Sequence, residues 1–329
     1  MTSGNGPEHA ESKPRRRRSD RDDRPGTAVD TDMFAAAIAT GRPFVASAAL
    51  ELGIVTRYAL KTRFRQLHPG VYVAVDKQLA TRDRIRAAGL WAPPDATITG
   101  WAAAHLYGEE WYSDRRCARV IDVHSPRPLR PASGVRVHAS SRTIPTADRW
   151  KLGGLWVVAP ARAAVDVARW TRGHDLKICA IDSICNSASI TLQAVEDAAG
   201  RMVGQHGVRA VADLLPHCDP GAQSPQETEM RLRIARSHLP TPTSQLEIFN
   251  EYGQKVATAD LGYEAEKVAI FYDGRGHSRE AQWLYDVQIN AELADLGWEV
   301  VRLAKGMLAG IAVHHIEQAL DRSRRKKDR

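Results

Sequence analysis

One stretch of the chain, residues 255–302, constrains the fold more than any other. Asp260 lies near the end of an apolar run, and residues 267–273 then alternate strictly in hydrophobic character. Such alternation is typical of a β-strand, because successive side chains of a strand point to opposite faces. The alternation places Phe271 and Asp273 on the same face of that strand.

A helix and a further strand are expected to complete this stretch. Ser278 is positioned to cap the helix, and Gln282 is placed to complete the capping pattern. The helix is expected to run to about Leu296 and to stop at Gly297, and residues 298–303 form another apolar strand. The order of elements therefore predicts a small α/β domain.

Acids on neighbouring strands are how a small α/β domain holds a divalent metal, because Mg²⁺ prefers oxygen ligands. The stretch resembles the PD-(D/E)XK nuclease superfamily and, more narrowly, a bacterial domain family related to very-short-patch-repair endonucleases. The matching segments are ADLG (259–262), VAIFYDGRGH (268–277), WLYD (283–286), LGWEVVRL (296–303) and, upstream, SPQETEMRLR (224–233). The resemblance implies a restriction-endonuclease-like domain over residues 219–320.

The resemblance also implies a catalytic site. Its residues in this chain are Glu227, Asp260, Asp273 and His277. Asp260 and Asp273 would bind Mg²⁺, and His277 would take or donate a proton at the scissile phosphate. Glu227 has a second interpretation, because it follows Ser224 by three residues and fits a helix capping box.

Position 271 departs from this pattern. Relatives carry Glu there as the second metal-binding acid, whereas this chain has Phe271, whose ring cannot bind a metal. Asp273 with Arg275 could replace the usual acid and base, or Glu227 could reach the site from its helix. The remaining alternative is that the fold persists and the catalysis is lost.

Residues 31–80 fit a winged helix-turn-helix. The expected helices and hairpin cover residues 33–40, 46–52, 57–64 and 66–75. The segment resembles the N-terminal DNA-binding domain of AbiEi-type antitoxins, whose wing ends in a pattern similar to LHPGVY (67–72). The resemblance implies DNA as a partner, and a toxin as a second one.

The third of these helices is the expected DNA-reading helix. Arg57 and Lys61 are one turn apart and share a face, and Arg63 and Arg65 extend the basic character towards the wing. Arginine can read guanine, whereas lysine mostly contacts phosphate. The alternatives are an exposed basic helix that only packs against its own domain, and a module that contacts protein.

Residues 81–218 are expected to form a mixed helical and β central region. In relatives that pair both end domains, a motif similar to GLWVVAPARAAVD (154–166) appears. Arg162 and Asp166 in this motif are four residues apart on a helix, which favours a structural salt bridge. Thr99 is expected to cap another helix of the region.

Bulk composition limits the partners. The net charge of +7 favours an anionic partner, above all nucleic acid. Residues 1–30 are expected to be a disordered basic tail and residues 321–329 a second basic tail. No apolar run reaches transmembrane length and the first residues carry no apolar signal segment, so a cytoplasmic protein without membrane partners is expected.

Three functions therefore compete. The first is a DNA-binding protein with an antitoxin-like regulatory role and a catalytically impaired nuclease-like domain. The second is an active endonuclease that needs Mg²⁺, and the third is a protein-interaction module. The expected fold class is α/β in the sense of several α+β units: a winged helix-turn-helix, a mixed central region and a restriction-endonuclease-like αβ domain.

Overall fold

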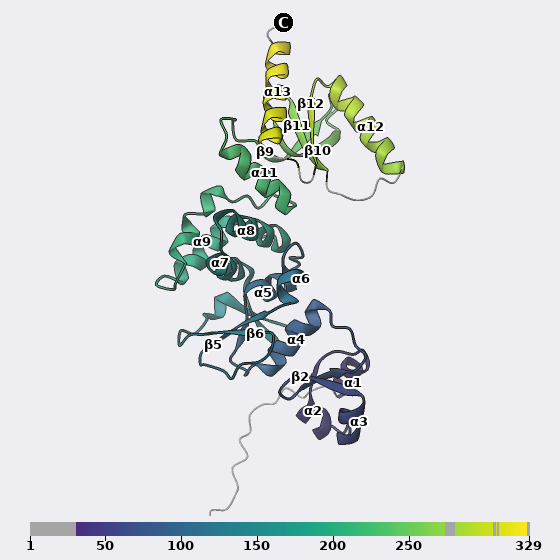
Figure 1. Ribbon diagram of the computed structural model, residues 1–329, viewed down its shortest axis with the longest axis vertical. Coiled ribbons are helices and arrows are strands. Elements are labelled where there is room, and N and C mark those ends of the chain that lie inside the picture. The colour runs from purple at the N-terminus through teal and green to yellow at the C-terminus, as the bar shows by residue number, and fades with distance from the viewer. Residues whose placement is uncertain (1–30, 274–279, 305–306, 308, 328–329) are drawn as a thin grey trace, which may run out of the picture.

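The chain forms three units that follow one another along its long axis (Figure 1). The computed structural model describes residues 31–273, 280–304, 307 and 309–327. Each unit has its own sheet, with strand orders β1-β3-β2, β6-β5-β4-β8-β7 and β12-β11-β10-β9. The predicted mixture of helices and sheets in α+β units is confirmed at this level.

The first unit packs three short helices beside a three-stranded sheet. Its elements are α1 (Thr31–Ala39), β1 (Phe44–Val45), α2 (Ala46–Glu51), α3 (Arg57–Thr62), β2 (Phe64–His68) and β3 (Val71–Ala74). Gly53 has a φ of 68° at the turn between α2 and α3, a left-handed conformation that glycine adopts without steric cost. The Thr56 hydroxyl accepts a hydrogen bond from the Ala59 amide at 3.1 Å and so begins α3. The third helix is shorter than predicted, because Phe64 already belongs to β2.

The central unit wraps helices around a mixed sheet. Its strands are β4 (Thr97–Ile98), β5 (Ile121–Ser125), β6 (Val135–Ala139), β7 (Arg149–Leu152) and β8 (Leu155–Val158). Its α-helices are α4 (Thr81–Trp91), α5 (Gly100–Leu106), α6 (Ser113–Cys117), α7 (Pro160–Trp170), α8 (His174–Ala188), α9 (Leu192–Arg201) and α10 (Arg209–Ala212). The two short 3-10 turns are η1 (Thr146–Asp148) and η2 (Leu215–His217).

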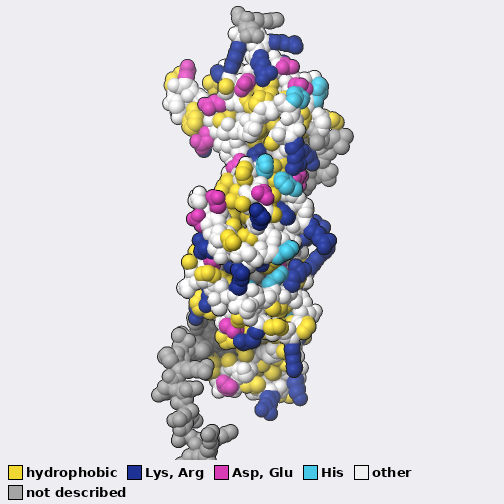
Figure 2. All heavy atoms as spheres, turned by 90° about the vertical axis from the view of Figure 1, so that its left-hand side faces the viewer, with side chains coloured by type: hydrophobic (Ala, Val, Ile, Leu, Met, Phe, Trp, Pro, Cys, Tyr) yellow, Lys and Arg dark blue, Asp and Glu magenta, His cyan; other side chains and the backbone are white. Residues whose placement is uncertain are grey.

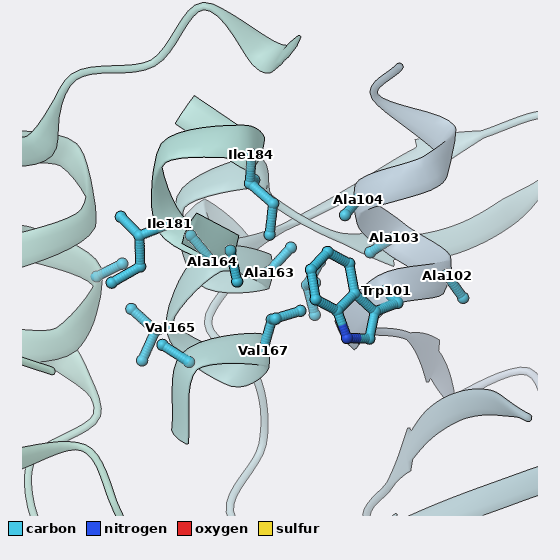
Figure 3. Packing of buried hydrophobic residues seen from close by; sticks show 14 of the residues in the cluster. Trp101, Ala102, Ala103, Ala104, Ala163, Ala164, Val165, Val167, Ile181 and Ile184 are labelled. Atoms are coloured by element: carbon cyan, nitrogen blue, oxygen red, sulfur yellow. The ribbon is translucent and has the colours of Figure 1, made fainter. Parts of the chain in front are cut away.

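The core of the central unit lies between α5, α7 and α8. The Trp101 ring of α5 points towards Val167 of α7 and Ile184 of α8 (Figure 3). Alanines dominate the facing positions of α5 and α7, and small side chains let the helices approach closely. Because this packing is dense, we expect the central unit to be a rigid support for the units at either end.

Asp166 anchors the start of α7 and α5 through a buried network. Its carboxylate accepts from Arg162 Nε at 3.0 Å, Arg169 Nε at 2.9 Å and the Thr99 hydroxyl at 2.7 Å. The predicted Arg162–Asp166 salt bridge is confirmed. The prediction that Thr99 caps α5 with its side chain is wrong, because that hydroxyl is used by Asp166 instead.

The C-terminal unit places helices on both faces of a four-stranded sheet. Its elements are α11 (Pro225–Ala235), β9 (Thr243–Phe249), β10 (Lys255–Tyr263), β11 (Val268–Asp273), α12 (Glu280–Asp295), β12 (Glu299–Ala304) and α13 (Ala309–Lys327). Val268 and Ile270 pack with α11 and α13, whereas Phe271 belongs to the cluster that contains Leu293 of α12. The predicted alternation of this strand is therefore confirmed.

The C-terminal end differs from the prediction. Residues 321–327 are not a tail, because they continue α13. Arg322 Nε and Lys326 Nζ contact the Glu299 carboxylate of β12 at 2.9 and 2.5 Å. The Glu299 carboxylate therefore holds this basic end of α13 against the sheet. Residues 1–30, Ser278 and residues 328–329 lie outside the described residues.

No single helix among the described residues is long and apolar enough to cross a bilayer. Among the described helices, α8 and α9 taken together meet the requirements of length and composition, but they are bent by 112° relative to each other. Both helices contribute apolar side chains to the core of the central unit.

Candidate functional site

The outward face of α3 is the most exposed basic surface of the first unit. Arg57, Tyr58 and Lys61 are exposed, and Tyr58 has 78% of its surface accessible. Neither Arg57, Lys61 nor Arg63 forms an ion pair with any carboxylate in the described part of the chain. Leu60 on the inner face of α3 packs against the small core that contains Val55. The outer face of the helix can therefore offer these cations to an anionic partner.

Arg57 and Lys61 also border a shallow hollow. Its volume is about 440 Å³, and it is lined by Leu50, Arg57, Leu60, Lys61, Phe64 and Tyr72. Basic and aromatic side chains at one hollow suit contact with a sugar-phosphate backbone. On the face drawn in Figure 2, Lys and Arg side chains lie on the first unit, along the central unit and at the C-terminal end, while Asp and Glu side chains are most frequent over the C-terminal unit and the adjoining part of the central unit.

The four predicted DNA-binding residues do not lie together. Arg63 ends α3 and is exposed near Lys61. Arg65 is half-buried on β2, donates from Nη2 to the Lys77 carbonyl at 2.9 Å, and lines a different cavity. Phe64 packs into the small core, so its neighbour Arg65 points away from that core. The structure brings together Arg57 and Lys61, which line one hollow, and separates Arg65 from them.

Asp260 lies where two strands part. Antiparallel pairing of β10 with β11 runs from Tyr263–Val268 to Leu261–Ile270. The next residue of β10 is Asp260, and its Oδ2 accepts from the Tyr272 amide at 2.6 Å. A side chain thus replaces a bond of the sheet ladder at the fork between the strands. Asp260 lies within β10 and not at its end, because the strand continues to Tyr263.

Glu227 approaches the same fork from α11. The Ser224 hydroxyl accepts from the Glu227 amide at 3.3 Å, which confirms the predicted helix cap. The Glu227 carboxylate is buried and its Oε2 accepts from the Gln223 amide and from Gln245 Nε2, each at 2.9 Å. Burial raises the pKa of Glu227, and the negative charge of Asp260 adds to the rise. The structure therefore brings Glu227 and Asp260 close enough for their charges to interact.

Gln245 is a site residue that the sequence did not reveal. It has a φ of 49° on β9, a left-handed conformation that is uncommon outside glycine. This conformation accompanies the hydrogen bond from its side chain to Glu227. Neither composition nor hydrophobic alternation indicates that Gln245 has a left-handed backbone conformation, so the sequence carries no signal for this residue.

Asp273 is the last residue of β11 and pairs with Ala304 of β12. Its side chain and all of His277 lie outside the described part of the structure. The predicted contributions of Asp273 and His277 to a site therefore stay predictions. Within the described residues, no group of three His, Cys, Asp or Glu side chains is arranged to hold a metal ion.

Phe271 occupies the position of the missing acid. Its half-buried ring packs in the apolar layer with Leu293, and the guanidinium of Arg302 lies 5.3 Å from the ring centroid. Arg302 is itself held by Asn290 of α12 at 3.1 Å. Position 271 therefore supplies no oxygen ligand for Mg²⁺, and the described carboxylates at the fork are those of Glu227 and Asp260.

Helix α11 joins the central unit to the C-terminal unit. Met230 and Ile234 belong to the C-terminal core, whereas Leu232 belongs to the central core. One turn after Glu227, Arg231 donates from Nη2 to Asp182 Oδ2 of α8 at 2.9 Å. The helix that carries Glu227 is therefore fixed by both cores.

Asp182 is the buried acid of this joint. It also accepts from the Thr228 hydroxyl at 2.9 Å and from the Asp219 amide at 2.7 Å. Burial raises the pKa of Asp182 to about 6 despite these donors. The sequence carried a signal that was missed, because Asp182 interrupts the apolar run ICAIDSIC at residues 178–185.

The four cysteines have structural positions. Cys117, Cys179 and Cys185 are buried, Cys218 is half-buried, and all four are free thiols. Burial raises the pKa of Cys117, Cys179 and Cys185 to about 12, so these thiols stay protonated near neutral pH.

Comparison with known proteins gives two relatives. "Uncharacterized protein MT2308" of Mycobacterium tuberculosis strain CDC 1551 / Oshkosh and "Uncharacterized protein Rv2248" of strain H37Rv are each 28% identical to this chain over 261 residues. Each alignment covers 76% of this chain and 91% of the relative. The aligned stretch is longer than any one of the three units. No family model matches the chain, and no solved structure matches it.

Proposed function

We propose that this chain binds duplex DNA through α3 and the adjacent wing, and that its C-terminal unit is a nuclease-related fold without cleavage activity. The observation that carries the proposal is the outward face of α3. It presents Arg57 and Lys61 one turn apart, exposed and without carboxylate partners among the described residues. A helix of this kind that follows a glycine turn is the reading element of a helix-turn-helix.

The apolar setting of Phe271 supports the absence of cleavage. Its ring is part of the packing beneath α12, so the position cannot supply a ligand without disturbing that layer. The hydrogen bond from Tyr272 to Asp260 gives this acid a structural role at the fork. An antitoxin-like regulator is the biological role that the resemblance suggests.

Salt dependence of DNA binding tests the first half of the proposal. Fluorescence anisotropy of a labelled 20-base-pair duplex would be measured with the full chain over a series of KCl concentrations. Each cation that contacts a phosphate contributes about 0.9 to the slope of log K against log salt. We expect the Arg57→Ala/Lys61→Ala double variant to bind more weakly and to lower this slope by about 1.8 if both cations contact phosphate.

A matched control is Arg82→Ala/Arg115→Ala, which removes two exposed arginines from the central unit. If both double variants lose affinity equally, the effect is one of net charge, and α3 is not the reading helix. If wild type does not bind duplex DNA, the protein-interaction function becomes the better proposal.

A second candidate function is an endonuclease that needs a divalent metal. The closeness of Glu227 and Asp260 favours it, since two interacting acids at a strand fork are suited to binding a cation. This candidate predicts cleavage of plasmid DNA that is abolished in Asp260→Ala. The same substitution has no effect on plasmid integrity if the chain only binds DNA.

A further inference from the structure

A second cavity lies between the wing of the first unit and the central unit. Its volume is about 360 Å³. Its lining comes from β2, the linker before α4, α4 itself, and the segments around α6 and β6: Arg65, Leu67, His68, Leu79, Arg84, Ala87, Cys117, Ala118, Arg119, Ile121, Ser133 and Gly134. The cavity is separate from the hollow beside Arg57 and Lys61, with which it shares no residue.

Three arginines line this cavity without a counter-charge. The lining contains no Asp or Glu. The side chains of Arg84 and Arg119 are exposed and have no hydrogen-bond or ion-pair partner among the described residues, and Arg65 bonds only the Lys77 carbonyl. Three guanidinium groups at one cavity repel each other, so an anion placed between them is stabilised.

His68 also lines the cavity. Its Nδ1 is buried and has no hydrogen-bond partner among the described residues. The ring lies 6.0 Å from that of Trp91. Burial lowers the pKa of His68, which favours the neutral ring, so the positive charge of the cavity comes from its arginines.

The other walls of the cavity are apolar. Leu67, Leu79, Ala87 and Ile121 line it beside the arginines. A volume of about 360 Å³ lies in the range of small-molecule sites. A bare phosphate would leave these walls uncovered, whereas a phosphate attached to a flat organic group would contact both kinds of wall.

We propose that the cavity between the wing and the central unit binds a small organic phosphate of about mononucleotide size. Arg65, Arg84 and Arg119 bind the phosphate, and the apolar walls contact the rest of the ligand. Arginine is suited to this task because its planar fork matches phosphate oxygens in pairs. The site is independent of DNA binding by α3.

Isothermal titration of the full chain with AMP at constant ionic strength tests this proposal. We expect AMP to bind, adenosine to bind at least about tenfold more weakly, and inorganic phosphate to compete with AMP. The Arg84→Ala/Arg119→Ala double variant should weaken AMP binding by about tenfold or more, since each charged hydrogen bond that is lost accounts for about that factor. Both residues are exposed, so their removal leaves the core intact.

The control is again Arg82→Ala/Arg115→Ala, which removes the same charge from α4 and α6 outside the cavity. This variant should bind AMP as wild type does. Equal losses in both variants, or equal binding of AMP and adenosine, would overturn the proposal. A duplex-DNA arm separates the two sources of phosphate: if Arg84→Ala/Arg119→Ala weakens DNA binding while AMP does not bind wild type, the cavity holds a backbone phosphate and the small-molecule site is refuted.

Discussion

Substitution of Asp182 is expected to loosen the joint between the central and C-terminal units. The Asp182 side chain is fully buried and accepts from Arg231, Thr228 and the Asp219 amide. Asp182→Asn keeps the size of the side chain but removes the negative charge that compensates Arg231. Arg231 is itself largely buried, so its charge would lose its nearest partner in a medium of low polarity.

The size of the effect follows from two opposing contributions. Removing one partner of a buried ion pair costs about 3–5 kcal/mol. Asp219 remains 3.7 Å from Arg231 Nε and compensates part of the charge. The raised pKa of Asp182, about 6, also means that its charged form is disfavoured by burial at pH 7, and the amide avoids that cost. We therefore expect a loss of about 3 kcal/mol, at the lower end of the range.

Urea unfolding of the full chain at pH 7, followed by circular dichroism, would measure the loss. The companion variant Asp182→Asn/Arg231→Met removes both charges but keeps an oxygen that can accept from the Asp219 amide, and we expect it to lie within about 1.5 kcal/mol of wild type. Hydrogen exchange of α11 amides should accelerate in Asp182→Asn and not in the double variant. A loss below about 1 kcal/mol in Asp182→Asn, or a double variant less stable than Asp182→Asn, would refute the reasoning.

Three other substitutions test separate parts of the structure. Burial lowers the pKa of His124 to about 4. Between pH 6.5 and pH 4 the unfolded chain therefore binds a proton that the folded chain does not. The free energy of unfolding then decreases by about 1.4 kcal/mol for each unit by which the pH falls. His124→Gln should remove this contribution to the pH dependence of stability, which urea unfolding at several pH values would measure. A difference in stability between variant and wild type that is the same at every pH would contradict the prediction. A Cβ on Gly262 would lie 2.6 Å from Leu246 Cδ2 and 3.0 Å from the Val268 carbonyl, so Gly262→Ala should cost about 1–3 kcal/mol in thermal or urea unfolding. Gly200→Ala in α9 meets no atom within 4 Å and should be neutral or slightly stabilising, and equal losses at both positions would contradict the packing argument. Phe271→Glu introduces an acid at the position where the nuclease families that the sequence resembles carry one, and calorimetry with Mg²⁺ should detect binding that wild type lacks; equal heats for both proteins would count against the importance of this position.

Local signals in the sequence predicted many elements well. The alternation of residues 267–273, the Arg162–Asp166 spacing on α7 and the Ser224 cap of α11 are all found in the structure. These features depend on neighbouring residues alone. Where tertiary contacts compete for the same side chain, the prediction was wrong, as at Thr99, whose hydroxyl binds Asp166 from a helix far along the chain.

Other features depend on long-range packing and left no local pattern. Strands β4 and β7 are short and were not predicted, because they exist through pairing with β5 and β8. The basic segment 321–327 resembles a solvated tail in composition, yet Glu299 fixes it on the sheet. The Arg65 side chain is close in sequence to Arg63 but lies apart from α3, because Arg65 belongs to β2 and points away from the small core that its neighbour Phe64 enters.

The candidate site was predictable in part. Sequence motifs placed Glu227 and Asp260 in one site, and the structure brings them into electrostatic contact. Neither Gln245 nor the joint at Asp182 was predictable from motifs, since each depends on a backbone conformation or on the arrangement of two cores. The cavity between the first unit and the central unit was likewise not predictable, because its three arginines come from segments that only the fold brings together.

The most direct test of DNA binding without cleavage is one set of samples read in two ways. Supercoiled plasmid and short duplexes, matched and mismatched, would be incubated with the full chain in Mg²⁺, in Mn²⁺ and in chelator, and then examined by gel shift and for nicking. We expect retarded complexes that dissociate in high salt, with the plasmid intact under every condition. Nicking that needs metal and disappears in Asp260→Ala would contradict this, and so would the absence of any complex with DNA.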